Sequence, residues 1–182
     1  MTWLQTASGR AFHILNPRVE DVDIDDIAHA LSHQCRFAGH SQSFYSVAQH
    51  SVLVSWLVPP EHKLAALLHD SAEAYLADVP TPLKQVMLQY REIEQRVLRV
   101  IGDRFGVELV DLPRCVHEAD RIMLATEQRD VMRNPPPFEW RATRGVEPDP
   151  SSIYPWSAGM AKLRFLVRFE ALSRAGVRGA AE

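Results

Sequence analysis

The chain has 182 residues, 46% of them hydrophobic and 24% charged, a composition typical of one soluble globular domain with a sizeable core. Its 20 Lys and Arg residues against 23 Asp and Glu residues give a net charge of -3, which disfavours a protein that coats nucleic acid or binds an anionic membrane. Two cysteines without CxxC spacing, Cys35 and Cys115, disfavour a disulfide scaffold. With no apolar run of membrane-spanning length and no secretory signal pattern, the sequence favours a cytoplasmic protein.

The first residues give the clearest strand signal, a short hairpin in which residues 3–6 and 11–15 flank a turn at 7–10. From Ile24 onward, apolar residues recur with helical spacing. We expect one helix to start at Ile24, and five more to span residues 43–56, 61–77, 83–105, 113–132 and 157–174. The predicted fold class is therefore all-α, a compact bundle of about six helices with a short N-terminal β-hairpin.

We expect one domain over residues 1–182, with its core at about 9–132 and a C-terminal loop and helix at about 133–176. Asn and three prolines at 134–137 break the helix that precedes them. The proline-rich and aromatic segment 138–156 is compatible with an interface, a lid or a plain surface loop. Residues 176–182 are expected to form a frayed tail.

A His-Asp pair, His69 and Asp70, follows the apolar run 64–68 inside the expected helix 61–77. Because a buried charge is costly unless it is paired, these two side chains need partners. A buried pair that satisfies itself is the simpler structural interpretation. Glu73 lies four residues after His69, a spacing that places both side chains on one helix face.

Further ionisable residues occur at apolar seams of other expected helices, namely His50 in one, and Glu118 and Asp120 in another. Two imidazoles and two carboxylates that converge from separate helices form a metal site of mixed nitrogen and oxygen ligands. A bound divalent ion lowers the pKa of its water and polarises a phosphoryl oxygen, and Glu73 could then handle the proton.

In order and setting, His50, His69-Asp70 and Asp120 match the H…HD…D signature of the HD-domain phosphohydrolases. Residues 67–84 resemble the central block of the bacterial 5′-deoxynucleotidase branch of that family. Arg36-Phe37, fourteen positions before His50, lies where that branch carries a phosphate-contacting arginine followed by an aromatic residue. The resemblance spans about residues 9–132 and implies a compact HD-domain helical bundle.

By this resemblance, His50, His69, Asp70 and Asp120 would bind one divalent ion, which could be cobalt, manganese, zinc, iron, nickel or magnesium. Glu73 would orient or deprotonate the attacking water.

The resemblance also implies roles for four residues around the metal. Asp78 would assist water activation or protonate the leaving group, and Arg36 would clamp the phosphate with its planar guanidinium. Lys84 would add a second cation. Phe37, where many relatives carry Trp, would pack against the sugar or the base.

Each of these four residues also has a structural alternative. Arg36 is compatible with an ion pair to a helix-end carboxylate, and Lys84 with a solvated position at a helix start. Asp78 is compatible with a helix-end cap, and Phe37 with the hydrophobic core.

The leading functional hypothesis is a metal-dependent phosphohydrolase that hydrolyses the 5′-phosphate ester of small deoxynucleotides with a metal-activated water. The alternative is a deoxynucleoside triphosphate triphosphohydrolase of the dATP type, which releases nucleoside and triphosphate. The short spacing between His69-Asp70 and Asp120 resembles those small enzymes, and Lys84 suits a longer phosphate chain.

Two other classes are disfavoured. A nucleotide-binding module without turnover needs neither Glu73 nor Asp78. A dinuclear site of the kind that hydrolyses cyclic nucleotides or alarmones is disfavoured because residues 71–116 contain no histidine. We expect a small nucleotide as substrate, no nucleic-acid polymer or membrane as partner, and a homo-oligomer, either a dimer or larger.

Overall fold

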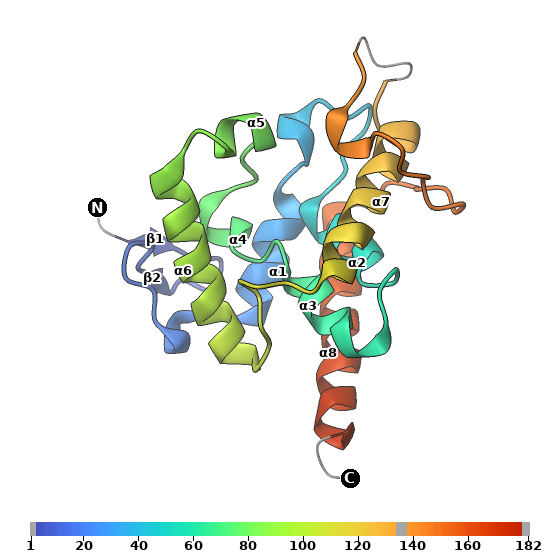
Figure 1. Cartoon of the computed structure of the whole chain (residues 1–182). Coiled ribbons are helices and arrows are strands. Elements are labelled where there is room, and N and C mark those ends of the chain that lie inside the picture. Colours follow the sequence, from blue (N-terminus) through green and yellow to red (C-terminus); the bar gives the residue numbers. More distant parts are fainter. Residues whose placement is uncertain (1–2, 134–137, 180–182) are drawn as a thin grey trace.

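The computed structural model describes residues 3–133 and 138–179, with side chains as far as Arg174. Over these residues the chain folds into a bundle of eight α-helices with one two-stranded sheet at the N-terminus (Figure 1). The all-α fold class and the N-terminal hairpin are thereby confirmed. The helices are α1 Ile24–His33, α2 Val47–Val54, α3 Lys63–Leu68, α4 Glu73–Leu76, α5 Thr81–Lys84, α6 Leu88–Phe105, α7 Arg114–Asp130 and α8 Ala158–Gly179. Within the described ranges, no helix combines the length and the apolarity that crossing a membrane requires.

The hairpin pairs β1 Leu4–Gln5 with β2 Ala11–Phe12 in antiparallel register, so its strands are shorter than the sequence suggested. The turn is joined to α1, because the backbone N–H and the hydroxyl of Ser8 each donate a 2.7 Å hydrogen bond to the Asp26 carboxylate. The Phe12 ring is buried and stacks on Tyr75 at 3.7 Å. The hairpin therefore covers the side of the bundle that α4 reaches.

The expectation of one continuous helix over residues 61–77 is wrong. Helix α3 ends at Leu68, and α4 begins at Glu73. Between them, two backbone hydrogen bonds join residues that are three positions apart, as in a 3₁₀ turn. The Ser71 N–H donates to the Leu68 carbonyl at 2.9 Å, and the Glu73 N–H donates to the Asp70 carbonyl at 3.0 Å. Such bonds turn the chain faster than an α-helix, so His69 and Glu73 do not share one regular helix face.

Three other helix boundaries also differ from the expectation. Helix α2 starts only at Val47, because Ser46 is extended and its hydroxyl caps the helix by accepting from the Gln49 N–H. The expected helix over 83–105 begins at Leu88, after the separate helical turn α5. At the C-terminus α8 continues to Gly179, so the part of the expected frayed tail that is described, 176–179, is helical. The expected break at 134–137 lies outside the described residues.

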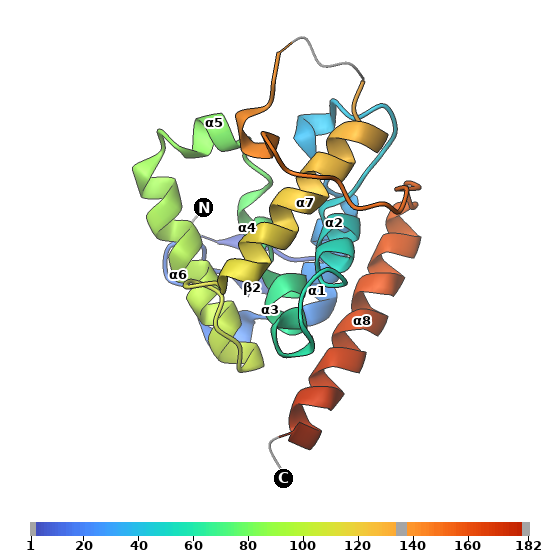
Figure 2. The ribbon, with the colours of Figure 1, turned by 45° about the vertical axis from the view of Figure 1, so that its right-hand side comes forward.

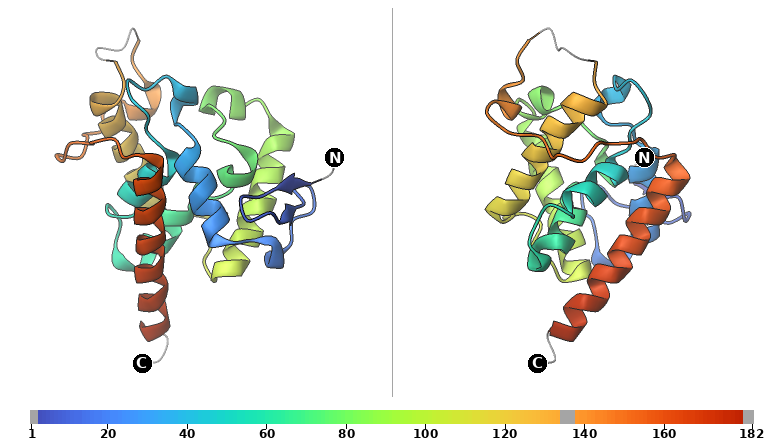
Figure 3. Two further views of the ribbon diagram at one scale, coloured as in Figure 1. Left: turned by 180° about the vertical axis from the view of Figure 1, so that it is seen from behind. Right: turned by 90° about the vertical axis from the view of Figure 1, so that its right-hand side faces the viewer.

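Helix α2 occupies the centre of the bundle, where it packs against α1, α3, α7 and α8. Helix α8 covers α1, α2 and α3 along one side, and its C-terminal end projects past the other helices (Figure 3). The buried apolar residues form two clusters, and both α2 and α3 contribute to each of them. A polar side chain on α2 is consequently surrounded by protein on every side.

The segment 138–156 runs along α7 and crosses α2 before it enters α8 (Figure 2). Its backbone is held by side chains of both helices. The Asp149 N–H donates to the Thr126 hydroxyl at 2.8 Å, and the Ile153 N–H donates to the Asp130 carboxylate at 2.8 Å. Gln49 on α2 holds the far end, since its amide donates to the Tyr154 carbonyl at 2.9 Å and accepts from the Trp156 N–H at 2.8 Å.

Replacement of Phe165 tests the packing of α8. Its ring is fully buried, so Phe165→Ala should lower the free energy of unfolding by about 3–5 kcal/mol, measured by urea denaturation. Leu163 on the same helix is 56% exposed, and Leu163→Ala should change that free energy by no more than about 0.5 kcal/mol. Equal losses in the two variants would contradict the orientation of α8.

Candidate metal centre

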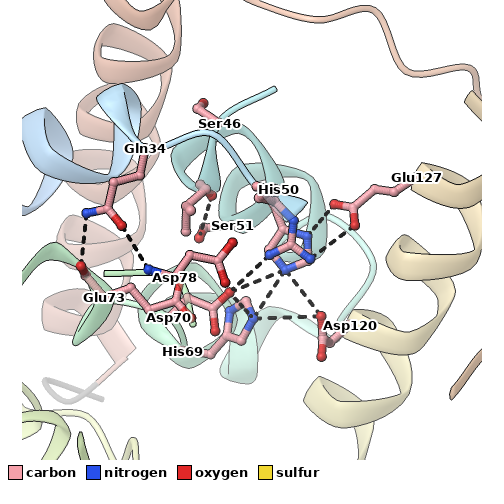
Figure 4. A network of polar contacts seen from close by, with 12 residues as sticks. Gln34, Ser46, His50, Ser51, His69, Asp70, Glu73, Asp78, Asp120 and Glu127 are labelled. Carbon is pink, nitrogen blue, oxygen red and sulfur yellow. Dashed lines mark hydrogen bonds and ion pairs between the residues drawn. The ribbon is translucent and has the colours of Figure 1, made fainter. Parts of the chain in front are cut away.

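Three elements far apart in the sequence bring His50, His69 and Asp120 together (Figure 4). His50 lies in α2, His69 follows α3 directly, and Asp120 lies in α7. The Nε2 atoms of the two histidines are 3.4 Å apart, and Asp120 Oδ1 lies 3.2 Å from His50 Nε2 and 3.9 Å from His69 Nε2. Within the described part of the chain, these three residues form a group that can hold a metal ion.

The outer nitrogens of both imidazoles are already engaged. His69 Nδ1 donates to the backbone carbonyl of Ala66 at 2.8 Å, and His50 Nδ1 donates to the Glu127 carboxylate at 2.6 Å. A carbonyl or a carboxylate accepts only, so both Nδ1 atoms carry the hydrogen. In the neutral rings the two Nε2 lone pairs then point at each other and at the Asp120 oxygen. A cation between them would satisfy all three acceptors.

The separations suit a divalent ion. Bonds of about 2.0–2.2 Å to nitrogen and oxygen place neighbouring ligand atoms about 3–3.5 Å apart. Two of the three separations, 3.4 Å and 3.2 Å, fall in that range, and the third, 3.9 Å, is slightly longer. The chemistry of the donor set, two nitrogens and one carboxylate, fits zinc, manganese, iron, cobalt or nickel.

Asp70 adjoins this group. Its Oδ2 lies 3.2 Å from His69 Nε2 and 3.5 Å from His50 Nε2. Burial alone would raise the pKa of Asp70, but His69, His50 and Arg36 outweigh it and hold that pKa well below the usual range. An ionised oxygen therefore stands beside the metal group, while ligation by Asp70 stays a prediction.

The charges around the centre favour positive charge on its two imidazoles. Burial and the Arg36 guanidinium lower the pKa of His50, but Glu127 and Asp120 outweigh both and raise it to about 9. Burial likewise lowers the pKa of His69, and Asp70 and Asp120 reverse that effect, so the net shift is upward. Both shifts express the same need for positive charge at this point in the fold.

Glu127 is a functional residue that the sequence analysis missed. It is fully buried in the last turns of α7, and it bonds His50 and Arg36 at once. Burial would raise its pKa, but Arg36 and His50 hold that pKa below the ordinary value. By fixing the hydrogen on His50 Nδ1, Glu127 directs Nε2 toward the centre, as the outer carboxylates of metal sites do. The signal in the sequence is its position seven residues after Asp120, which puts both on one side of α7.

The Arg36 guanidinium lies inside the site. Its Nη2 donates to Glu127 Oε2 at 3.1 Å, and its Nη1 lies 3.6 Å from Asp70 Oδ2. The ion pair with a helix-end carboxylate, which was the structural alternative for Arg36, is therefore present. Its Nε is buried and has no hydrogen-bond acceptor among the described residues. The N–H at Nε thus remains for a ligand.

Lys84 is not a solvated lysine. Its ammonium donates to the Glu94 carboxylate at 2.6 Å and lies 3.6 Å from Glu73 Oε1. Burial lowers the pKa of Lys84, but its bond to Glu94 and the charge of Glu73 outweigh this and raise it. The lysine is therefore held by two carboxylates.

Glu73 is buried at the start of α4, and its Oε2 has no hydrogen-bond partner within the described ranges. Burial first, and then the charges of Asp70 and Asp78, raise its pKa well above the usual value. A buried carboxyl group whose pKa is shifted in this way is a candidate acid-base group.

The Asp78 side chain points toward Asp70 and His50 (Figure 4). Burial and the charge of Asp70 raise its pKa, although Arg36 and His50 oppose them. Over the described residues, no hydrogen bond joins its carboxylate to a helix end. The helix-cap alternative for Asp78 therefore finds no contact in the structure.

Phe37 packs partly buried at the edge of the second hydrophobic cluster, next to Arg36, whose guanidinium lies 5.3 Å from its ring. The Trp140 ring, from the segment 138–156, lies 5.8 Å from the Phe37 ring. Phe37 therefore stands beside the arginine and Trp140 beside Phe37, and the sequence indicated only the first of these two rings.

Solvent exposure of the side chains increases from the histidine side of the centre to its carboxylate side. The side chains of His50 and His69 are 0% and 7% exposed, whereas those of Asp70 and Asp120 are 21% and 42% exposed. The histidine side is consequently closed by protein, and the carboxylate side is open to solvent and to a small ligand.

The chain is similar to two bacterial proteins. It is 41% identical over 174 residues to the uncharacterized protein YfdR of Escherichia coli, an alignment that covers 95% of this chain and 97% of YfdR. It is 34% identical over 142 residues to the uncharacterized protein RCAP_rcc00048 of Rhodobacter capsulatus, with 71% of this chain and 72% of that protein covered. No family model matches the chain. Because these names assign no activity, function has to be argued from the site.

Glu127→Gln tests the support of the metal group. The amide loses the charge that fixes His50 and balances Arg36, so we expect affinity for Mn²⁺ to fall about 10–100-fold in calorimetric titration. The matched control is Glu118→Gln on the same helix, where Glu118 is half exposed and bonds only Arg114 in the described residues, at 2.7 Å. Wild-type affinity in Glu127→Gln would contradict the assigned role.

Proposed function

The chain belongs to the same family as YfdR, and we propose that it is a divalent-metal-dependent phosphohydrolase that removes the 5′-phosphate of small deoxynucleotides. The observation that carries this proposal is the group of His50, His69 and Asp120, whose inward-facing atoms are all hydrogen-bond acceptors. When bound there, a divalent ion would lower the pKa of its water and polarise a phosphoryl oxygen.

Arg36 supports a phosphate ligand. Its guanidinium is held in place by Glu127 and lies beside Asp70, while Nε keeps a buried hydrogen without an acceptor among the described residues. A phosphate oxygen is the strong acceptor that such a donor lacks. The role of a clamp next to the metal follows from that position.

Glu73 supports hydrolysis rather than binding alone. A buried carboxyl group with a raised pKa and an unpaired oxygen costs stability and contributes nothing to holding a metal. Acid-base work on a water molecule is the chemistry that such a group performs. Asp78, directed toward the same centre, would assist it.

The contacts of Lys84 favour a single phosphate over a triphosphate. Its ammonium is bound by Glu94 and adjoins Glu73, so two carboxylates already compete for the charge that a longer phosphate chain would need. Arg36, whose Nε lacks an acceptor among the described residues, is then the cation that a single phosphate would contact.

Phe37 and Trp140 would take the nucleoside. The Phe37 ring beside Arg36, with the Trp140 ring 5.8 Å from it, offers an apolar surface on which a base or a sugar would pack.

The assay that tests the proposal incubates metal-loaded protein with each deoxynucleoside monophosphate and triphosphate and identifies every product by chromatography. We expect nucleoside and orthophosphate from monophosphates. His69→Ala should abolish turnover, and His62→Ala, in the short helix Pro60–His62, should not.

Nucleoside and intact triphosphate as products would instead establish the triphosphohydrolase. No turnover with any of manganese, cobalt, zinc, iron, nickel or magnesium would contradict both enzymes and favour a binding module.

Glu73→Gln should inactivate the enzyme and stabilise the metal-free fold. Below pH 4.5, the ordinary pKa of Glu, the folded and unfolded states both hold the proton, and the variant gains nothing. Above pH 4.5 the unfolded state ionises, while the folded state keeps the proton up to its own higher pKa, so over that range the wild type loses stability with rising pH and the glutamine variant does not. Urea denaturation between pH 4 and 8 should show the variant's advantage growing.

The control for this variant is Glu92→Gln on the exposed face of α6, which should change the free energy of unfolding by no more than about 0.5 kcal/mol and leave turnover intact. An inactive Glu73→Gln that is also less stable at pH 8 would contradict the account of Glu73.

A further inference from the structure

The side chain of Gln34 clamps the backbone on both sides of the segment that carries Glu73 and Asp78. Its amide nitrogen donates to the Glu73 carbonyl at 2.9 Å, and its amide oxygen accepts from the Asp78 N–H at 3.1 Å. Figure 4 shows both bonds and the two carboxylate residues that they hold. One side chain therefore fixes two residues that are five positions apart.

Gln34 is itself fixed to the two helices next to the site. Its N–H donates to the Ala30 carbonyl at the end of α1, and its carbonyl accepts from the Val47 N–H, the first residue of α2. Val47 stands three residues before His50. Gln34 thus connects two parts of the site. Its backbone carbonyl binds the helix that carries His50, and its side-chain amide binds the segment that carries the two acidic residues.

The segment that Gln34 holds contains one residue with a strained backbone conformation. Ala77, directly before Asp78, has φ 66° and ψ 158°, a region that residues with a Cβ rarely occupy. A strained residue keeps such a conformation only where neighbouring contacts impose it. The hydrogen bond that the Asp78 N–H donates to the Gln34 amide oxygen is a contact that can do so.

We propose that Gln34 is a positioning residue that sets where Glu73 and Asp78 stand relative to the metal group. This inference rests on the proposed function, because it assigns to Glu73 and Asp78 a reaction for which their placement matters. A shift of about 1 Å in an acid-base group can reduce a rate about 100-fold.

The chain provides a matched control, Gln49. Its amide also donates to one backbone carbonyl and accepts from one backbone N–H, those of Tyr154 and Trp156, and it is buried. Gln34→Met and Gln49→Met therefore each remove two bonds of the same type and keep a side chain of similar length. They differ in which segment is released.

The experiment measures three quantities for the wild type and both variants: hydrogen exchange of the Asp78 amide in metal-free protein, kcat and KM on deoxynucleoside monophosphates, and the melting temperature. In Gln34→Met we expect exchange of the Asp78 amide to accelerate at least about 10-fold. In the same variant we expect kcat to fall about 10–100-fold while KM changes less than about twofold. In Gln49→Met we expect a comparable drop in melting temperature, with the exchange rate and kcat within about twofold of the wild type.

Two results would overturn the inference. One is wild-type exchange at Asp78 in Gln34→Met, since the clamp would then not hold the segment. The other is an equal loss of kcat in both variants, since the effect would then be general destabilisation. If Gln34→Met does not fold, Gln34→Glu, which keeps the acceptor for Asp78 and loses the donor to Glu73, takes its place with the same criterion for kcat. Absence of turnover in the wild type would overturn the proposed function alone, because the exchange comparison needs no activity.

Discussion

A hydrogen bond from His50 Nδ1 to Glu127, 2.6 Å long and shielded from solvent, determines which nitrogen of His50 faces the centre. A second bond, from His69 Nδ1 to a backbone carbonyl, does the same for the other imidazole. With both outer nitrogens engaged, the inward atoms of His50, His69 and Asp120 are all acceptors when the rings are neutral, and such a set is more stable with a cation between them. The rest of the site follows from this requirement, because the buried negative charge of Glu127 also needs a counter-ion, and the Arg36 guanidinium supplies it.

The fold meets this requirement by placing α2 in the middle of the bundle and by interrupting the helix after Leu68. The tight turn that follows α3 places His69 and Asp70 at the centre. The next helix then begins at Glu73, which is buried there. A continuous helix would have carried these side chains around its axis at 100° per residue. Local backbone irregularity and a costly buried carboxyl group thus coincide where chemistry is proposed, as is common at functional sites.

The sequence predicted the helical class because apolar spacing and proline positions mark α1 and α7 closely. It also named His50, His69 and Asp120, whose types and order match a known signature. It missed the break after Leu68, since the apolar run continues into Ala72 and Tyr75 and no Gly or Pro marks the turn. Glu127 has only a weak signal, its spacing from Asp120, and Gln34 has none, because their roles depend on contacts 77 and 44 residues away in the sequence that only the packing of the bundle creates.

Anomalous diffraction from crystals of the protein grown with Mn²⁺ tests most directly whether the acceptor set in α2, α7 and the turn after α3 is a metal centre. We expect one strong peak per chain, about 2.0–2.3 Å from His50 Nε2, His69 Nε2 and an Asp120 oxygen. The same map would decide whether Asp70 is a fourth ligand. The absence of a peak at these atoms, with the crystals saturated in metal, would show that the group is not a metal centre.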